Sequence, residues 1–344
     1  MTNLYKTQRR SNMEKKKIYD ELEKDVLQSN LSDKDKTQML KNIMKLKEGK
    51  LNILVTGATG AGKSSTINAL FDIEKAKIGT SADPETMDIV RYEMDNLILW
   101  DTPGLGDGIE NDKRHAKNII DKLTEVDEKN APLIDLVLVI LDGGSRDLGT
   151  SYDLINTILI PHLGENAKER ILIAINQCDV AMKGRYWNES ENKPEPKLVE
   201  FLEEKVKSVQ KRIKEDTGVT IEPIYYSAGY KEEGEPQCKP YNLSKLLYYI
   251  VKATPSEKRT LFLNQTNPEK EMWEEDDEIL DYKTETKKGI WESLMERLED
   301  GIDDIKMYTE VFYDVYLEDA FGKIANKAKD VFEGFGNFFR NLFG

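Results

Sequence analysis

A glycine-rich segment, Gly57–Ser64, follows an apolar run at 51–56 and precedes a helical pattern at 64–72. Its sequence GATGAGKS fits the pattern GxxxxGK[ST], for which a preceding strand and a following helix are the confirming context. Glycines let the backbone wrap closely around phosphate oxygens, and the helix adds the positive end of its dipole. The segment therefore predicts a phosphate-binding loop within an α/β fold.

Two side chains of this loop have expected roles of their own. Lys63 is expected to bridge the β- and γ-phosphates of a nucleoside triphosphate, and the Ser64 hydroxyl is expected to ligate Mg²⁺. The residues of the loop that we expect to contact the nucleotide are Gly57, Ala58, Thr59, Gly60, Ala61, Gly62, Lys63, Ser64 and Ser65.

Short aliphatic and β-branched runs alternate with helical patterns across the middle of the chain. The runs lie at 51–57, 88–94, 97–101, 133–142, 170–176 and 221–228, and the helical patterns lie at 64–72, 112–129, 149–162, 196–215 and 242–253. Such alternation predicts a doubly wound α/β fold with a mostly parallel sheet covered on both faces. The close pair 88–94 and 97–101 predicts a hairpin that adds one antiparallel edge strand.

Helical segments are expected on both sides of this core. The pattern predicts an N-terminal helical segment at 1–49, a nucleotide-binding domain at 50–254 and a C-terminal helical domain at 255–344. Two helices are expected in the first segment, with Asn30–Ser32 between them as the cap of the second. The alternative is a disordered charged arm. The acidic run Glu274–Glu278 is expected to be a solvated face or loop.

The sequence Asp101-Thr-Pro-Gly104 ends the predicted strand LILWD. A carboxylate at the carboxyl end of such a strand points toward the phosphate crevice of an open α/β sheet. Asp101 is therefore expected to hold Mg²⁺, and the Gly104 N–H is expected to approach the γ-phosphate. A threonine before this motif should close over the metal when the triphosphate is bound. We predict Thr86 for this role, with Thr80 as the alternative.

The sequence Asn176-Gln177-Cys178-Asp179 follows the strand RILIAI. The Asp179 carboxylate can accept two hydrogen bonds from N1–H and the exocyclic amine of guanine, whereas adenine offers no such donor pair. Asn176 is expected to contact the purine edge, and Gln177 is expected to cover the base. Ser227 and Ala228 end the last predicted strand, and their N–H groups are expected to reach the guanine carbonyl oxygen.

These ordered motifs resemble the GTPase superfamily that includes Ras-like and translation-factor GTPases. GATGAGKSSTINALF and LWDTPGLGDG are similar to the Era-like branch and to immunity-related GTPases, and NQCDVAMKGRYW resembles a bacterial group of predicted Era-related GTPases. The resemblance covers residues 50–254. The flanking helices resemble the layout of immunity-related and dynamin-related GTPases.

The resemblance implies a protein that binds GTP and GDP and hydrolyses GTP with Mg²⁺ as a conformational switch. The alternatives are an interaction module with negligible hydrolysis and an Era-like GTPase of the ribosome or RNA. Many relatives place a water-orienting Gln directly after the glycine of the aspartate motif, but this chain has the apolar Leu105 there. We therefore expect slow intrinsic turnover, raised by a partner or by homodimerisation through the nucleotide face.

Charge and cysteine content narrow the class of protein. The net charge of −14 disfavours broad docking onto nucleic acid, because an acidic chain repels phosphate backbones. Two isolated cysteines give no disulfide framework, so a reducing cytoplasm is expected. His115 and His162 are expected to have surface or capping roles. The most apolar stretch is too short to cross a membrane.

The C-terminal stretch 321–344 combines an apolar face rich in Phe with a local excess of Lys and Arg. A helix of this kind can pack against the other helical segments or lie in a membrane interface. Both alternatives stay open, and the second predicts peripheral membrane contact.

Overall fold

The computed structural model describes residues 19–302, with the exception of 21, 25, 30, 72–76, 81–88, 107, 231–237 and 264. The chain falls into two compact units. The helical unit is drawn from Met1–Gly49, Ser256–Asn264 and Ile290–Gly344, and the sheet unit from Lys50–Pro255 and Gln265–Gly289. The three consecutive segments expected from the sequence stay a prediction. The stretch 321–344 lies outside the described residues.

The sheet unit contains a seven-stranded sheet in the order β2-β3-β4-β1-β5-β6-β9. Strands β4, β1, β5, β6 and β9 run parallel to one another, whereas the β2–β3 and β3–β4 pairs are antiparallel. The strands are β1 (Leu51–Gly57), β2 (Lys77–Thr80), β3 (Val90–Met94), β4 (Leu97–Asp101), β5 (Leu136–Asp142), β6 (Ile171–Asn176) and β9 (Ile224–Tyr225). The expected mostly parallel α/β sheet is confirmed.

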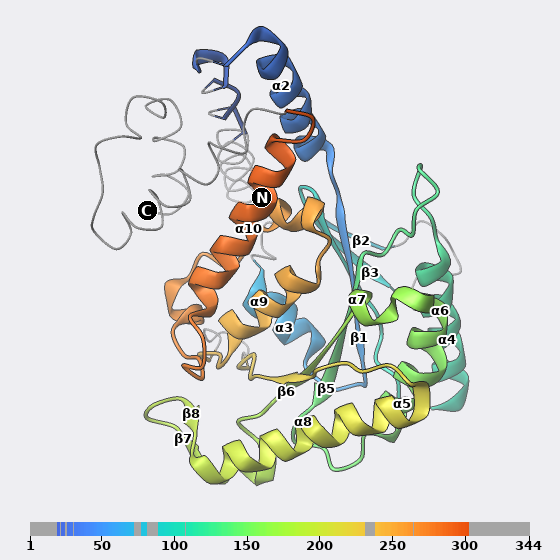
Figure 1. Ribbon diagram of the computed structural model, residues 1–344. Helices are drawn as coiled ribbons and strands as arrows, with labels where there is room; N and C mark the ends of the chain where they lie inside the picture. The colour runs from blue at the N-terminus through green and yellow to red at the C-terminus, as the bar shows by residue number, and fades with distance from the viewer. Residues whose placement is uncertain are drawn as a thin grey trace, which may run out of the picture. The chain divides into compact units, whose positions relative to one another are not determined.

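Helices cover both faces of this sheet (Figure 1). The side chains of the central strands β1, β5 and β6 are therefore buried on both faces. One face packs against α4, α8 and the helical run from α5 to α6, and α3 packs beside α9 next to β1 and β6. The helices of the unit are α3 (Lys63–Leu70), α4 (Ile109–Thr124), α5 (Gly149–Asp153), a π-helical stretch (Leu154–Leu159), α6 (Ile160–Leu163), α7 (Ala167–Arg170), α8 (Pro196–Thr217) and α9 (Leu243–Ala253).

Short elements complete the sheet unit. Strands β7 (Trp187–Asn188) and β8 (Lys193–Pro194) form a small separate hairpin between the turn at Ala181–Gly184 and α8. The remaining 3₁₀ turns of the unit lie at Gly164–Asn166 and Lys270–Trp273.

The edge of the sheet differs from the sequence expectation in two respects. The hairpin of β3 and β4 forms as predicted, but β3 is not the edge strand, because β2 pairs with it antiparallel and takes the edge. The last strand, expected at 221–228, is only the two residues of β9. The apolar runs of the sequence predict no strand at 77–80, because β2 is only four residues long and is defined by its pairing with β3.

In the helical unit, α2 (Asp33–Glu48) begins as expected, with the Ser32 hydroxyl accepting a hydrogen bond from the Asp35 N–H at 3.2 Å. Acidic residues in its first turn and lysines in its last turn complement the helix dipole. Its apolar face shares a core with Trp291, Leu294 and Leu298 of α10 (Tyr282–Leu298). A 3₁₀ turn at Ser256–Phe262 belongs to the same unit.

Within the part of the chain that the structure describes, no helix has the length and apolar character needed to span a bilayer.

Candidate nucleotide-binding site

Three predicted motifs begin where parallel strands of the sheet end. Strand β1 ends at Gly57, β4 at Asp101 and β6 at Asn176. The strand register brings these ends to the same edge with a small stagger. Asp101 is opposite Val55, two residues before the end of β1, and Asn176 is opposite Asp142, two residues beyond the partner of Gly57 in β5. The carboxyl edge of an open parallel sheet is where such folds bind ligands. The fold thus brings the phosphate and guanine motifs to one edge.

The glycine-rich loop turns from β1 into α3 through left-handed backbone. Gly62 has φ +85°, and a Cβ there would overlap the side-chain nitrogen of Asn176, so only glycine fits. The Lys63 ammonium donates to the carbonyl oxygens of Gly57 at 3.3 Å and Ala58 at 3.2 Å. The other residues of the loop differ in exposure. Ala61 is buried, Ser65 is half-buried, and Thr59, Gly60 and Ser64 are exposed.

Asp101 lies beside this loop and is 9% exposed. Its Oδ2 accepts a hydrogen bond from the Ser64 hydroxyl at 3.5 Å, and its buried Oδ1 has no donor among the described residues. Burial raises the pKa of Asp101 to about 6, although the positive charge of Lys63 and the Ser64 hydrogen bond oppose the shift. The carboxylate is therefore costly to ionise unless a cation joins it.

The residues after Asp101 contact the glycine-rich loop directly. The Thr59 N–H donates to the Leu105 carbonyl at 2.9 Å. A Cβ on Gly104 would lie 2.5 Å from the backbone nitrogen of Thr59, so the close approach requires glycine. A ring nitrogen of His115 lies 3.2 Å from the Gly104 carbonyl oxygen. The expected surface role of His115 is wrong, because α4 buries it against this loop at 6% exposure.

The guanine motif is tied to the glycine-rich loop by two side chains. Asn176 Nδ2 donates to the Ala61 carbonyl at 3.0 Å, and Gln177 Nε2 donates to the Gly60 carbonyl at 2.7 Å. Asp179 has a buried Oδ1 without a donor among the described residues. These contacts place Asn176 between the phosphate loop and the base-reading residues.

The last motif, Ser227 and Ala228, follows β9. The Ala228 N–H donates to Asn176 Oδ1 at 2.9 Å, and the Ser227 N–H donates to the Tyr241 carbonyl at 3.0 Å. Contact of these N–H groups with the guanine carbonyl stays a prediction. The preceding Tyr226 was missed by sequence reasoning. Its buried hydroxyl lies 2.6 Å from the Thr66 hydroxyl in α3, and burial raises its pKa.

The role of a switch threonine stays a prediction. Thr86 lies outside the described residues, and the alternative Thr80 is the last residue of strand β2. Clusters of three or more His, Cys, Asp or Glu able to hold a metal are absent from the described part of the chain. The Asp101 and Ser64 oxygens nevertheless fit Mg²⁺, which takes few protein ligands and completes its shell with phosphates and water.

Comparison with known proteins agrees with this geometry. Residues 52–177 match the family model of 50S ribosome-binding GTPases. Translocase of chloroplast 125 from Physcomitrium patens is 39% identical over 113 residues, 31% of this chain and 9% of the translocase. Interferon-gamma-inducible GTPase 10 from Mus musculus is 42% identical over 67 residues, 18% of this chain and 16% of that protein.

A similar solved structure is the LeoA bacterial dynamin GTPase from ETEC, at a TM-score of 0.39 and 15% identity, over 92% of this chain and 48% of LeoA. The chain spans only 9% of the length of the translocase it matches. The specific resemblance to the Era-like branch stays a prediction. The family match covers the glycine-rich loop, the aspartate motif and the start of the guanine motif, which the fold gathers at one edge of the sheet. Residues 52–177 are therefore similar to a P-loop GTPase domain.

Proposed function

We propose that this domain binds GTP, hydrolyses it to GDP and phosphate with Mg²⁺, and acts as a nucleotide-dependent switch. One observation carries the proposal: the Oδ1 atoms of Asp101 and Asp179 are buried without a donor among the described residues. A buried polar atom left unpaired costs about 1–3 kcal/mol. A ligand that brings a cation to Asp101 and N–H donors to Asp179 removes both costs.

The phosphate end of the site would be held by the loop and by Lys63. The backbone N–H groups of the loop and the Lys63 ammonium would contact the negatively charged phosphate oxygens, and Ser64 and Asp101 would hold Mg²⁺. When bound, Mg²⁺ neutralises charge on the phosphates as the terminal P–O bond breaks. Water would attack the γ-phosphorus, the bond from this phosphorus to the β–γ bridging oxygen would break, GDP would leave, and the proton of the water would pass to the released phosphate. The buried Leu105 cannot orient that water, so we propose slow intrinsic hydrolysis.

The base end of the site would be read by the guanine motif. The Asp179 carboxylate would accept the N1–H and the exocyclic amine of guanine, and Asn176 would hold the purine edge beside Ala228. Thr86 remains our proposed metal-closing threonine, which would give the switch its dependence on the γ-phosphate. We also propose a cytoplasmic location, because Cys178 and Cys238 are both free thiols.

Asp179→Asn is expected to weaken GTP binding at least about 100-fold, because two hydrogen bonds to a charged acceptor are lost or reversed. The measurement is titration of wild type and variant with GTP and with ATP, followed by a single-turnover assay with GTP and Mg²⁺. Glu189→Gln, at an exposed carboxylate further along the chain, is the matched control. Equal affinity of the wild type for GTP and ATP would contradict the proposal. Tight binding without turnover would support an interaction module instead.

We further propose that two copies associate through the nucleotide face. A hollow of about 620 Å³ is lined in part by the exposed cations Lys183 and Arg185, which follow the guanine motif in the chain, and by the exposed Arg146. The same lining holds the exposed carboxylates Asp147 and Glu204, so the cations of one copy can pair with carboxylates on the same face of the second copy. Light scattering should show a dimer with a non-hydrolysable GTP analogue and a monomer with GDP. Arg146→Glu should abolish this difference, and identical masses of the wild type with both nucleotides would refute the idea.

A further inference from the structure

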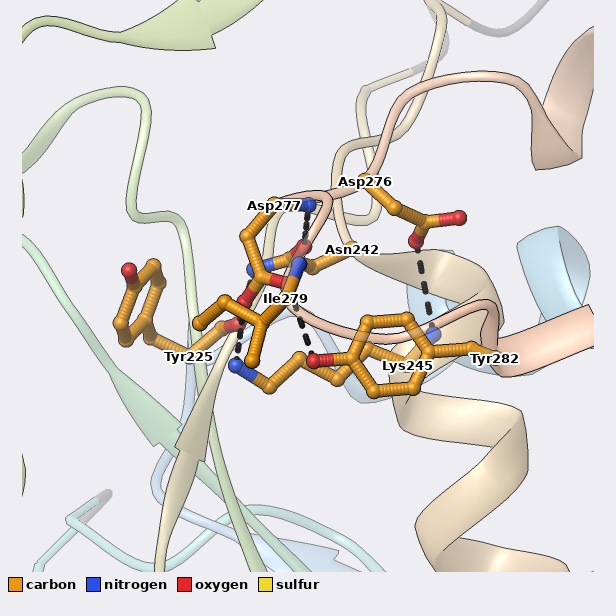
Figure 2. A network of polar contacts seen from close by, with 7 residues as sticks. All are labelled: Tyr225, Asn242, Lys245, Asp276, Asp277, Ile279 and Tyr282. Carbon is orange, nitrogen blue, oxygen red and sulfur yellow. Dashed lines mark hydrogen bonds and ion pairs between the residues drawn. The ribbon is translucent and has the colours of Figure 1, made fainter. Parts of the chain in front are cut away.

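The acidic run Glu274–Glu278 is a loop, as one of the two expected forms, but it is not solvated throughout. Asp277 is buried against the start of α9, where its side chain is 6% exposed and pairs with the 10% exposed side chain of Lys245 at 2.5 Å. Figure 2 shows the run wrapped over the end of β9 and the first turn of α9. The sequence did not signal this, because the partner Lys245 lies in a different part of the chain.

Four polar contacts fix Asp277 in place (Figure 2). One carboxylate oxygen accepts from the Lys245 ammonium, and the other accepts from the Tyr282 hydroxyl at 2.9 Å and the Ile279 N–H at 3.2 Å. Its own N–H donates to Asn242 Oδ1 at 2.8 Å. The buried carboxylate of Asp277 therefore has a cation and two hydrogen-bond donors as partners. Replacing it with a neutral side chain would leave the Lys245 ammonium buried without its charge partner.

Asn242 carries the connection from Asp277 to the sheet. It has left-handed backbone, φ +58°, directly before α9. Its N–H donates to the Glu275 carbonyl at 2.8 Å, and its side-chain Nδ2 donates to the Tyr225 carbonyl at 3.1 Å. Asn242 is completely buried, so the acidic run and the end of β9 are held in one arrangement.

From this point hydrogen bonds lead to the base-reading residues. Tyr241, next to Asn242, exchanges two backbone hydrogen bonds with Ser227, at 2.9 and 3.0 Å. Ala228 donates to Asn176 Oδ1, and Asn176 Nδ2 donates to the carbonyl of Ala61 in the phosphate loop. The acidic run is therefore linked to both polar ends of the Asn176 side chain by a series of hydrogen bonds and the peptide bonds Asn242–Tyr241 and Ser227–Ala228.

We propose that Asp277 is a positioning residue for base recognition, which holds Asn242 and, through it, Ser227 and Ala228 against Asn176. The proposal rests on the proposed function, because it concerns how the same site reads guanine. Under this proposal, recognition of guanine also involves a segment outside residues 52–177, which match the family model. Specificity for guanine then depends on residues that follow the sheet in the chain.

The experiment measures affinities of the full-length protein for GDP and for ADP, by competition with a fluorescent GDP analogue. ADP reports the phosphate loop without guanine reading. Asp277→Asn should weaken GDP binding at least about tenfold and change ADP binding less than about twofold. Glu278→Gln, an exposed carboxylate of the same run, is the matched control and should change neither affinity.

A milder variant keeps the test decisive if Asp277→Asn folds poorly. Tyr282→Phe removes one hydrogen bond to Asp277 and keeps the ring, and it should weaken GDP binding about threefold with ADP unchanged. Equal weakening of GDP and ADP, or no effect in folded variants, would overturn the positioning role. Failure of the wild type to distinguish GDP from ADP would instead overturn the proposed function itself.

Discussion

Asp101→Asn is expected to make the metal-free protein more stable at pH 7. Burial raises the pKa of Asp101 from 3.8 to about 6. The folded state therefore holds a proton that the unfolded state releases, and folding becomes costlier as pH rises through this range. The free-energy cost of ionising Asp101 in the folded state is absent below pH 3.8 and reaches its full size above about pH 6. A shift of this size corresponds to about 3 kcal/mol, which sets the upper limit of the gain.

The measurement is denaturant unfolding of nucleotide-free protein in a chelator, between pH 4 and pH 7. The stability difference between Asp101→Asn and the wild type should grow with pH and level off above pH 6. Asp153→Asn, at an exposed carboxylate on α5, should show no such trend. A variant less stable than the wild type at pH 7 without metal would show that the carboxylate has a protein partner we have not identified.

The same substitution should have the opposite effect on function. An amide oxygen lacks the charge that holds Mg²⁺, so Asp101→Asn should lower GTP hydrolysis at least about 100-fold at physiological Mg²⁺. The gain in stability and the loss of activity would together identify a carboxylate kept at an energetic cost for its ligand. Unchanged Mg²⁺ dependence in the variant would remove Asp101 from the metal site.

Gly104→Ala is expected to reduce GTP hydrolysis about 100-fold while changing GDP affinity less than about threefold. The new Cβ would lie 2.5 Å from the backbone nitrogen and Cα of Thr59, so backbone must move. Asn176 and Gln177 hold the phosphate loop from its other side, so the segment carrying Gly104 is the one that gives way. The Gly104 N–H then leaves the γ-phosphate side of the site.

Single-turnover hydrolysis and GDP titration measure the two effects separately. Gly289→Ala is a suitable control, because a Cβ there meets no atom within 4 Å. Adding Thr59→Gly should not rescue the variant, since the nearest atoms include the Thr59 backbone. Hydrolysis at the wild-type rate by Gly104→Ala would show that the contact with Thr59 plays no part in catalysis.

The strand-end motifs were predictable because their chemistry is local. A buried strand, a glycine-rich turn and a helix start are consecutive in the chain, so Gly57–Ser64 predicts its own conformation. The parallel sheet followed from the alternation of elements, and its carboxyl edge then placed Asp101 and Asn176 beside the loop. The Ser32 cap of α2 was also predictable from the sequence, because the cap residue and the helix are adjacent in the chain.

Other features depended on contacts that no local sequence pattern signals. Strand β2 exists because it pairs with β3, and His115 is buried because α4 packs it against Gly104. From the sequence, the Asp277 carboxylate is expected to be solvated. In the folded protein it is buried, because the fold brings Lys245 next to it.

The sequence by itself determined the phosphate loop, the guanine motif and the parallel sheet that carries them, since each follows from short-range turn chemistry and apolar periodicity. Only the tertiary structure decided which charged and polar side chains became buried around that site, because burial and ion pairing are set by which distant segments meet.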